Sequence, residues 1–176
     1  EGPYQAANAM VAVKTARILR KRGFSITEEA IRRGIAQARW PGRMERAGEG
    51  FYLDGAHNPA GAAAFEQAAF EILKRTGKEA FLLFGAMEDK DYREMARILC
   101  KRIPWKEVGF VCCGGKRGAL IQSLKEAFSQ VREERMLEFS SAAQAIACME
   151  ERRGDDLVFC AGSLYLTGEF RKALRE

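Results

Sequence analysis

The sequence predicts an α/β fold with a mostly parallel sheet of about six strands, helices on both faces of the sheet, and a short helical segment before it. Two observations lead to this prediction. From residue 51 onward, short apolar runs alternate with stretches of helical period. The first 40 residues show helical spacing alone. Because alternating strands and helices favour parallel pairing, the main domain is expected to be Rossmann-like.

Two helices are expected before residue 41. Apolar side chains recur at helical spacing over residues 5–22, and Gly23 is suited to end that helix. The Thr27 hydroxyl can cap a second helix over residues 28–38. Pro41 then disfavours helical geometry in the residue before it, so a domain boundary is expected there.

The rest of the chain is expected to alternate strands with helices. The predicted strands are residues 51–53, 80–84, 108–112, 136–139 and 157–160, with a further short strand near residues 44–46. The predicted helices are residues 60–75, 92–102, 119–131, 142–152 and 164–174. Open parallel sheets bind ligands beyond the carboxyl ends of their strands, so the loops that follow the strands are the candidates for a site.

Four such loops are rich in glycine and polar residues: 54–59, 85–91, 113–118 and 161–163. In the first, His57 is the only histidine of the chain and lies on a turn into a helix. Asn58 can cap that helix, and Pro59 suits its first position. Such a turn directs backbone N–H groups toward an anion. A histidine in a turn is also often only a hydrogen-bonded surface group, so spacing alone leaves its role open.

The composition argues against several classes of protein. The chain has 176 residues, 47% hydrophobic and 30% charged, as in an average soluble globular protein. No apolar run approaches a membrane span, and the first residues lack the pattern of a signal peptide, so we expect a cytoplasmic protein. Five cysteines without a C-x-x-C pair predict no metal site. Basic residues alternate with glutamates rather than with aromatics, so no nucleic-acid partner is expected.

Two blocks carry a family resemblance. Trp40-Pro41-Gly42-Arg43 and Leu53-Asp54-Gly55-Ala56-His57-Asn58-Pro59 resemble the C-terminal domain of folylpolyglutamate synthase and dihydrofolate synthase, in the Mur ligase superfamily. Residues 85–91 and Gly162-Ser163-Leu164-Tyr165-Leu166 match as well. Residues 2–9 look like the helix that closes the family's central ATPase domain, where a histidine usually stands in place of Tyr4. The resemblance thus spans nearly the whole chain.

The resemblance also implies a domain organisation. The P-loop of the family's central domain, Gly-x-x-x-x-Gly-Lys-Ser/Thr, does not occur in this sequence. Residues 1–40 would therefore be a helical segment from the end of an absent central ATPase domain, and residues 41–176 the C-terminal glutamate-ligase domain. The chain would be a C-terminal portion of a longer enzyme and inactive alone.

The function that the resemblance implies is ATP-dependent addition of L-glutamate to a folate or to dihydropteroate, through an acyl phosphate. Magnesium would be bound mainly by the absent P-loop domain. ATP would be contacted by Arg43, Asp54, His57 and Asn58, with Asp54 accepting from a ribose hydroxyl. His57 would be catalytic and would also face the glutamate, whose carboxylate Ser163 would bind, with Arg117 as a second candidate. The resemblance leaves open whether dihydrofolate, folylpolyglutamate or both are made.

Two other functions use some of the same residues. Asp54, His57 and Ser163 are the residue types of a hydrolase triad, but Ser163 lacks a Gly-x-Ser-x-Gly context and Asp54 stands only three residues before His57. The second alternative is a non-catalytic Rossmann-type module that binds a nucleotide or a partner protein. The sequence lacks Gly-x-Gly-x-x-Gly after its first strand, which gives dinucleotide binding little support.

Overall fold

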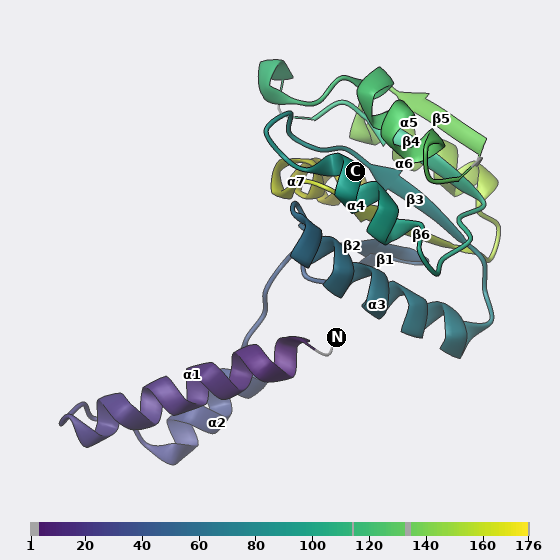
Figure 1. Ribbon diagram of the computed structural model, residues 1–176. Coiled ribbons are helices and arrows are strands. Elements are labelled where there is room, and N and C mark those ends of the chain that lie inside the picture. The colour runs from purple at the N-terminus through teal and green to yellow at the C-terminus, as the bar shows by residue number, and fades with distance from the viewer. Residues whose placement is uncertain (1–3, 114, 133–134, 176) are drawn as a thin grey trace. The chain divides into compact units, whose positions relative to one another are not determined.

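The computed structural model describes residues 4–113, 115–132 and 135–175 (Figure 1). The chain divides into two compact units, Glu1–Pro41 and Gly42–Glu176, and each is described by itself. Among the described residues, no helix is both long enough and apolar enough to cross a membrane.

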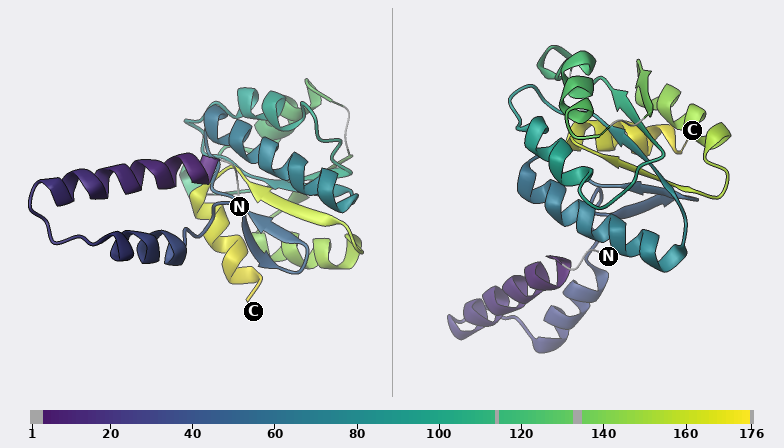
Figure 2. Two further views of the ribbon diagram at one scale, coloured as in Figure 1. Left: turned by 90° about the horizontal axis from the view of Figure 1, so that it is seen from below. Right: turned by 45° about the vertical axis from the view of Figure 1, so that its right-hand side comes forward.

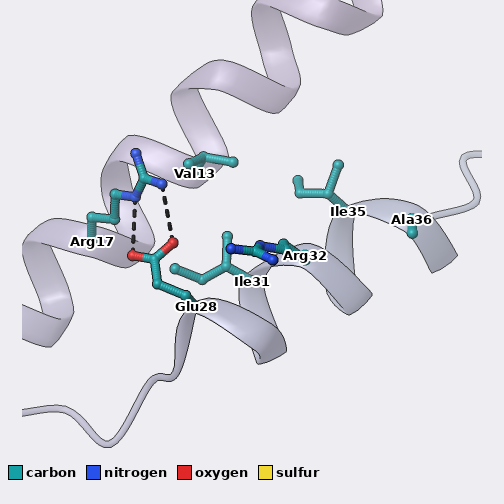
Figure 3. A pocket seen from close by; sticks show the side chains of 7 residues that line it. All are labelled: Val13, Arg17, Glu28, Ile31, Arg32, Ile35 and Ala36. Atoms are coloured by element: carbon teal, nitrogen blue, oxygen red, sulfur yellow. Dashed lines mark hydrogen bonds and ion pairs between the residues drawn. The ribbon is translucent and has the colours of Figure 1, made fainter.

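The first unit is a pair of helices, α1 (Tyr4–Lys21) and α2 (Glu28–Gln37). The Thr27 hydroxyl accepts a hydrogen bond from the Ala30 N–H at 3.0 Å, as expected for the cap of α2. Arg17 of α1 pairs with Glu28 of α2 at 3.0 Å (Figure 3). A groove of about 330 Å³ lies between the helices. Its apolar side chains include Val13, Ile31 and Ile35.

Apolar side chains of this unit are unusually exposed. Met10, Val11 and Ile18 of α1 and Phe24 after it are each more than half exposed, and Ile31 is the one buried hydrophobic residue described in the unit. The unit is also basic, because residues 1–41 hold eight Lys and Arg but three Glu. The other 21 basic residues are balanced by 21 acidic ones, so the whole net charge of +5 lies in this segment.

Amide hydrogens of α1 and α2 should exchange with solvent well before those of the sheet. Helices with few buried contacts open locally at little free-energy cost, whereas strand β3 (Ala80–Phe84) is buried throughout. Hydrogen exchange read by mass spectrometry checks this expectation, on a sample shown by size-exclusion chromatography to be monomeric. Protection in α1 equal to that in β3 would contradict it, and a second protein concentration controls for association through the exposed apolar side chains.

The second unit is built on the predicted sheet, with spatial order β1-β2-β6-β3-β4-β5. Strand β1 pairs antiparallel with β2, and every other neighbouring pair is parallel, which confirms a mostly parallel six-stranded sheet. The remaining bounds are β1 (Glu45–Gly48), β2 (Phe51–Leu53), β4 (Glu107–Val111), β5 (Arg135–Phe139) and β6 (Leu157–Ala161).

Helices cover both faces of the sheet, also as predicted (Figures 1 and 2). One face packs against α3 (Pro59–Thr76), α4 (Tyr92–Leu99) and α5 (Ile121–Ser129), and the other against α6 (Ala142–Arg152) and α7 (Leu164–Ala173). Successive side chains of β6 point to opposite faces of the sheet. Phe159 packs on the face covered by α3, α4 and α5, and Val158 and Cys160 pack on the face covered by α6 and α7.

Helix α4 is shorter than predicted, ending at Leu99 instead of residue 102. The indole N–H of Trp105 donates to the Leu99 carbonyl oxygen at 3.0 Å. This side-chain donor takes the place of the backbone N–H that would have continued the helix at that carbonyl. The period of the sequence could not reveal such a contact.

The topology predicts a ligand-binding position beside β6. After β2 and β3 the chain enters α3 and α4 on one face, whereas after β6 it enters α7 on the opposite face. Neighbouring strands whose following helices go to opposite faces leave a crevice beyond their carboxyl ends. All four candidate loops follow parallel neighbours, so they lie along one edge of the sheet.

Candidate functional site

Asp54 follows β2 and is buried at the edge of the sheet. Its Oδ2 accepts from the Met44 N–H at 2.8 Å, and its Oδ1 accepts from the Ala56 N–H at 2.9 Å. The Asp54 carbonyl oxygen also accepts from the Thr167 hydroxyl at 3.2 Å. These bonds tie the loop after β2 to residue 44 and to α7.

Arg43 lies on the short loop that these bonds hold against Asp54. Gly55 donates its N–H to the Gly42 carbonyl oxygen at 2.7 Å, on one side of Arg43, and Met44 is bonded to Asp54 on the other. Met44 has a positive φ of 48°, an uncommon conformation for a residue with a side chain, and these bonds hold it in place. The structure therefore brings half-buried Arg43 beside Asp54.

His57 and Asn58 form the turn into α3. His57 Nδ1 lies 2.8 Å from the Gly55 carbonyl oxygen. A carbonyl oxygen can only accept, so Nδ1 is the donor in this bond, and Nε2 is the ring nitrogen that this bond does not engage. Asn58 Oδ1 accepts from the Gly61 N–H at 2.7 Å, and Pro59 begins the helix, so the predicted cap is confirmed.

The geometry disfavours the hydrolase triad. In a triad the histidine Nδ1–H is oriented by a carboxylate, whereas here it donates to a backbone carbonyl. The Asp54 carboxylate accepts from two backbone N–H groups. Ser163 Oγ accepts from the Tyr165 N–H at 3.2 Å as the cap of α7.

Ser163 is buried where the ends of three strands meet. Its hydroxyl lies close enough to the Cys113 thiol to lower the pKa of that group, and the Cys113 thiol donates to the Ala86 carbonyl oxygen at 3.2 Å. Burial has the larger effect and raises the pKa of the Cys113 thiol, which keeps it protonated as a donor. Sequence reasoning missed Cys113, although its place at the start of the glycine-rich loop after β4 was a usable signal.

Arg117 lies on a short 3₁₀ turn, Gly115–Arg117, in that same loop. Its carbonyl oxygen accepts from the Glu88 N–H at 3.0 Å, which joins the loops after β3 and β4. The Arg117 guanidinium carbon lies 6.0 Å from the centroid of the Tyr165 ring. The pKa of Asp89 is lowered chiefly by a hydrogen bond from Lys90, with the charge of Arg117 contributing.

Glycines allow the loops to approach through their backbones. Gly162 has a φ of 112°, and a Cβ built there would overlap the carbonyl oxygen of Gly85. A Cβ at Gly85 would in turn overlap the carbonyl oxygen of Val111. The Gly162 N–H donates to the Ala56 carbonyl oxygen at 2.8 Å. Hydrogen bonds and close backbone contacts thus join the four loops into one polar surface.

The structure groups the predicted residues in two parts of this surface. Arg43, Asp54, His57 and Asn58 lie around the loop after β2, and Ser163 and Arg117 are linked through Tyr165. Among the described residues, no group of three or more His, Cys, Asp or Glu side chains could hold a metal ion. The surface combines the buried Ser163 hydroxyl and Asp54 carboxylate with the arginines Arg43 and Arg117, whose charge suits an anionic ligand.

Comparison with known proteins identifies the family. Residues 42–164 match the model of the glutamate ligase domain of Mur ligases, so the chain belongs to the Mur ligase family. It is 35% identical to the probable bifunctional folylpolyglutamate synthase/dihydropteroate synthase of Haloferax volcanii, covering 97% of this chain and 20% of that protein. It is 31% identical to the dihydrofolate synthase/folylpolyglutamate synthase of Bacillus subtilis, covering 99% of this chain and 40% of that protein.

A solved structure agrees with these matches. The chain superposes on FolC of E. coli in complex with ADP with a TM-score of 0.78 and 28% identity, over 96% of this chain and 39% of that one. The resemblance to the C-terminal domain of folylpolyglutamate and dihydrofolate synthases is thereby confirmed. The chain spans less than half the length of these relatives.

Proposed function

We propose that residues 41–176 form the glutamate-ligase domain of an ATP-dependent enzyme that adds L-glutamate to a folate or to dihydropteroate. The observation that carries the proposal is the joined surface of four loops at the carboxyl edge of the sheet, in a chain of the Mur ligase family. In the proposed reaction a substrate carboxylate attacks the γ-phosphate of ATP and releases ADP, leaving an acyl phosphate. The glutamate amine then attacks the acyl carbon, displaces phosphate and loses a proton to form the amide.

The surface would form one wall of a cleft, whose other wall is a central P-loop domain. The relatives are long enough to contain such a domain, because this chain covers 40% or less of their length. Residues 1–40 would belong to that domain, which is supported by the exposed apolar side chains of α1. One wall buries little of a nucleotide, so the 176-residue chain alone is expected to be inactive.

ATP would contact the loop after β2. The side chain of half-buried Arg43 would neutralise phosphate charge, and the Asp54 carboxylate would accept from a ribose hydroxyl. Asn58, whose Oδ1 caps α3, would present its amide NH₂ to the nucleotide. Magnesium, when bound, would neutralise charge on the phosphates, with its ligands mainly on the P-loop domain.

His57 would act at the reacting phosphate. Because Nδ1–H is held by the Gly55 carbonyl oxygen, Nε2 is the ring nitrogen that would contact the reacting phosphate and stabilise negative charge in the transition state. The N-terminus of α3, directly after His57, adds backbone N–H groups that favour an anion at the same place.

The glutamate would bind at the other part of the surface. The Ser163 hydroxyl accepts from the Tyr165 N–H and can donate its own hydrogen to a carboxylate. The exposed Arg117 guanidinium supplies the positive charge that a second carboxylate needs. Both groups would hold the amino acid while its amine attacks.

In the full-length ligase, Ser163→Ala should raise the KM for glutamate by about 10- to 150-fold, the effect of one lost hydrogen bond to a charged group. The KM for ATP should change little. His57→Ala should lower kcat, because it removes stabilisation of charge at the phosphate. Steady-state kinetics with glutamate and ATP varied in turn measures these effects.

Two controls sharpen the test. Ser129→Ala removes an exposed hydroxyl on α5 that bonds to the Glu126 carbonyl, and it should leave both constants unchanged. Ser163→Gly loses the hydroxyl with a smaller capping penalty than alanine, so it should reproduce the rise in KM. If Ser163→Ala altered the KM for ATP alone, the amino-acid pocket would not lie at the end of β6.

A further inference from the structure

Tyr165 links the two residues assigned above to the glutamate. Its backbone N–H donates to Ser163 Oγ at 3.2 Å, and its ring lies 6.0 Å from the guanidinium carbon of Arg117. The three residues come from two separate segments, the first turn of α7 and the loop after β4. A single tyrosine therefore connects the buried hydroxyl of the pocket to the cation at its rim.

We propose that Tyr165 is a positioning residue, whose ring holds the Arg117 guanidinium where it can bind a carboxylate of the incoming amino acid together with Ser163. This inference rests on the proposed function, since it needs glutamate to bind at these two residues. The site would thereby select an amino acid with a second carboxylate, one acid group at Ser163 and the other at Arg117.

Arg117 needs such positioning because little else fixes it. Its side chain is exposed and extends from a three-residue turn that begins at Gly115 with a φ of 55°. A long side chain on such a turn has many rotamers, and each unproductive one lowers affinity for the ligand. Contact with a ring reduces that freedom before the ligand arrives.

An aromatic ring can fix the position of the Arg117 guanidinium without using its N–H groups, whereas a carboxylate would use them. A guanidinium attracted to an aromatic face keeps the N–H groups in its own plane available, whereas a salt bridge would consume them. Asp89 is a carboxylate near Arg117, and its hydrogen bond from Lys90 Nζ at 3.0 Å offsets its competition for Arg117. Arg117 can thus meet a ligand carboxylate with both N–H groups of one edge.

Because Tyr165 is exposed, an effect of its replacement on ligand binding can be distinguished from an effect on the packing of the core. The residue is 62% exposed and belongs to neither apolar cluster of the sheet. Replacing its side chain should therefore leave the melting temperature of the protein nearly unchanged. A change in kinetic constants on replacement then reports on the contact with Arg117.

The test is a double-mutant cycle in the full-length ligase. Tyr165→Ala should raise the KM for glutamate by about two- to fivefold, the range expected for an exposed cation–π contact, without changing the KM for ATP. Tyr165→Phe keeps the ring and should rescue the KM, whereas Tyr165→Leu keeps bulk without the ring and should not. Arg117→Ala should raise the KM more, and Tyr165→Ala should add nothing in that background.

The outcomes distinguish the two proposals. If Arg117→Ala raises the KM for glutamate but Tyr165→Ala does not, the positioning role is wrong and the proposed pocket stands. If the effect of Tyr165→Ala persists in the Arg117→Ala background, Tyr165 acts without Arg117 and the inference is overturned. If neither Ser163→Ala nor Arg117→Ala changes the KM for glutamate, the proposed function itself fails at this site.

Discussion

Asp54→Ala should lower the free energy of unfolding of the α/β unit by about 3–6 kcal/mol, because two buried hydrogen bonds to a carboxylate contribute roughly 1.5–3 kcal/mol each. The substitution leaves the N–H groups of Met44 and Ala56 without their acceptor. It also releases the loop that carries Arg43. Urea unfolding followed by circular dichroism measures the change.

Two substitutions test whether the carboxylate is the cause. Asp54→Asn keeps one acceptor oxygen but turns an NH₂ group toward a backbone N–H, so an intermediate loss is expected. Asp155→Ala removes an exposed carboxylate elsewhere in the unit and should change stability by less than about 0.5 kcal/mol. A loss below about 1 kcal/mol for Asp54→Ala would mean that Asp54 does not anchor the turn. Activity of Asp54 variants in the full enzyme should be compared only between folded proteins.

Gly162→Ala should destabilise the same unit by about 2–6 kcal/mol, from backbone strain of roughly 1–3 kcal/mol and overpacking of roughly 1–3 kcal/mol. Gly162 has a φ of 112°, and a Cβ there would meet the Gly85 carbonyl oxygen and the Phe84 ring. Relief of this overlap would push the loop after β6 away from β3 and move Ser163, so glutamate binding should weaken as well.

Gly77→Ala is the matched control for strain alone. Gly77 caps α3 with a φ of 66°, but nothing lies within 4 Å of a Cβ built there. Its expected cost is about 1–2 kcal/mol, the penalty of the left-handed conformation. Denaturant midpoints of the two variants, measured side by side, isolate the overlap at Gly162. Equal losses would show that the loops after β6 and β3 are not closely packed.

Local patterns in the sequence determined most of the elements. Buried strand β3 and helix α6 are seen at their predicted residues, because apolar runs and helical spacing act within a few residues. The caps by Thr27 and Asn58 were predictable for the same reason, since each side chain bonds a backbone N–H three residues ahead. The helical spacing of α1 was also predictable, but the exposure of its apolar side chains is seen only in the structure.

Only the tertiary structure decided how the loops meet. The insertion of β6 between β2 and β3 brings Gly162 to Ala56, more than one hundred residues away, and no periodicity encodes that order. The same long-range pairing sets Cys113 behind Ser163 and places Arg117 against Tyr165. Residue types at strand ends can name candidates for a site, but contacts between distant segments depend on the packing of the whole sheet.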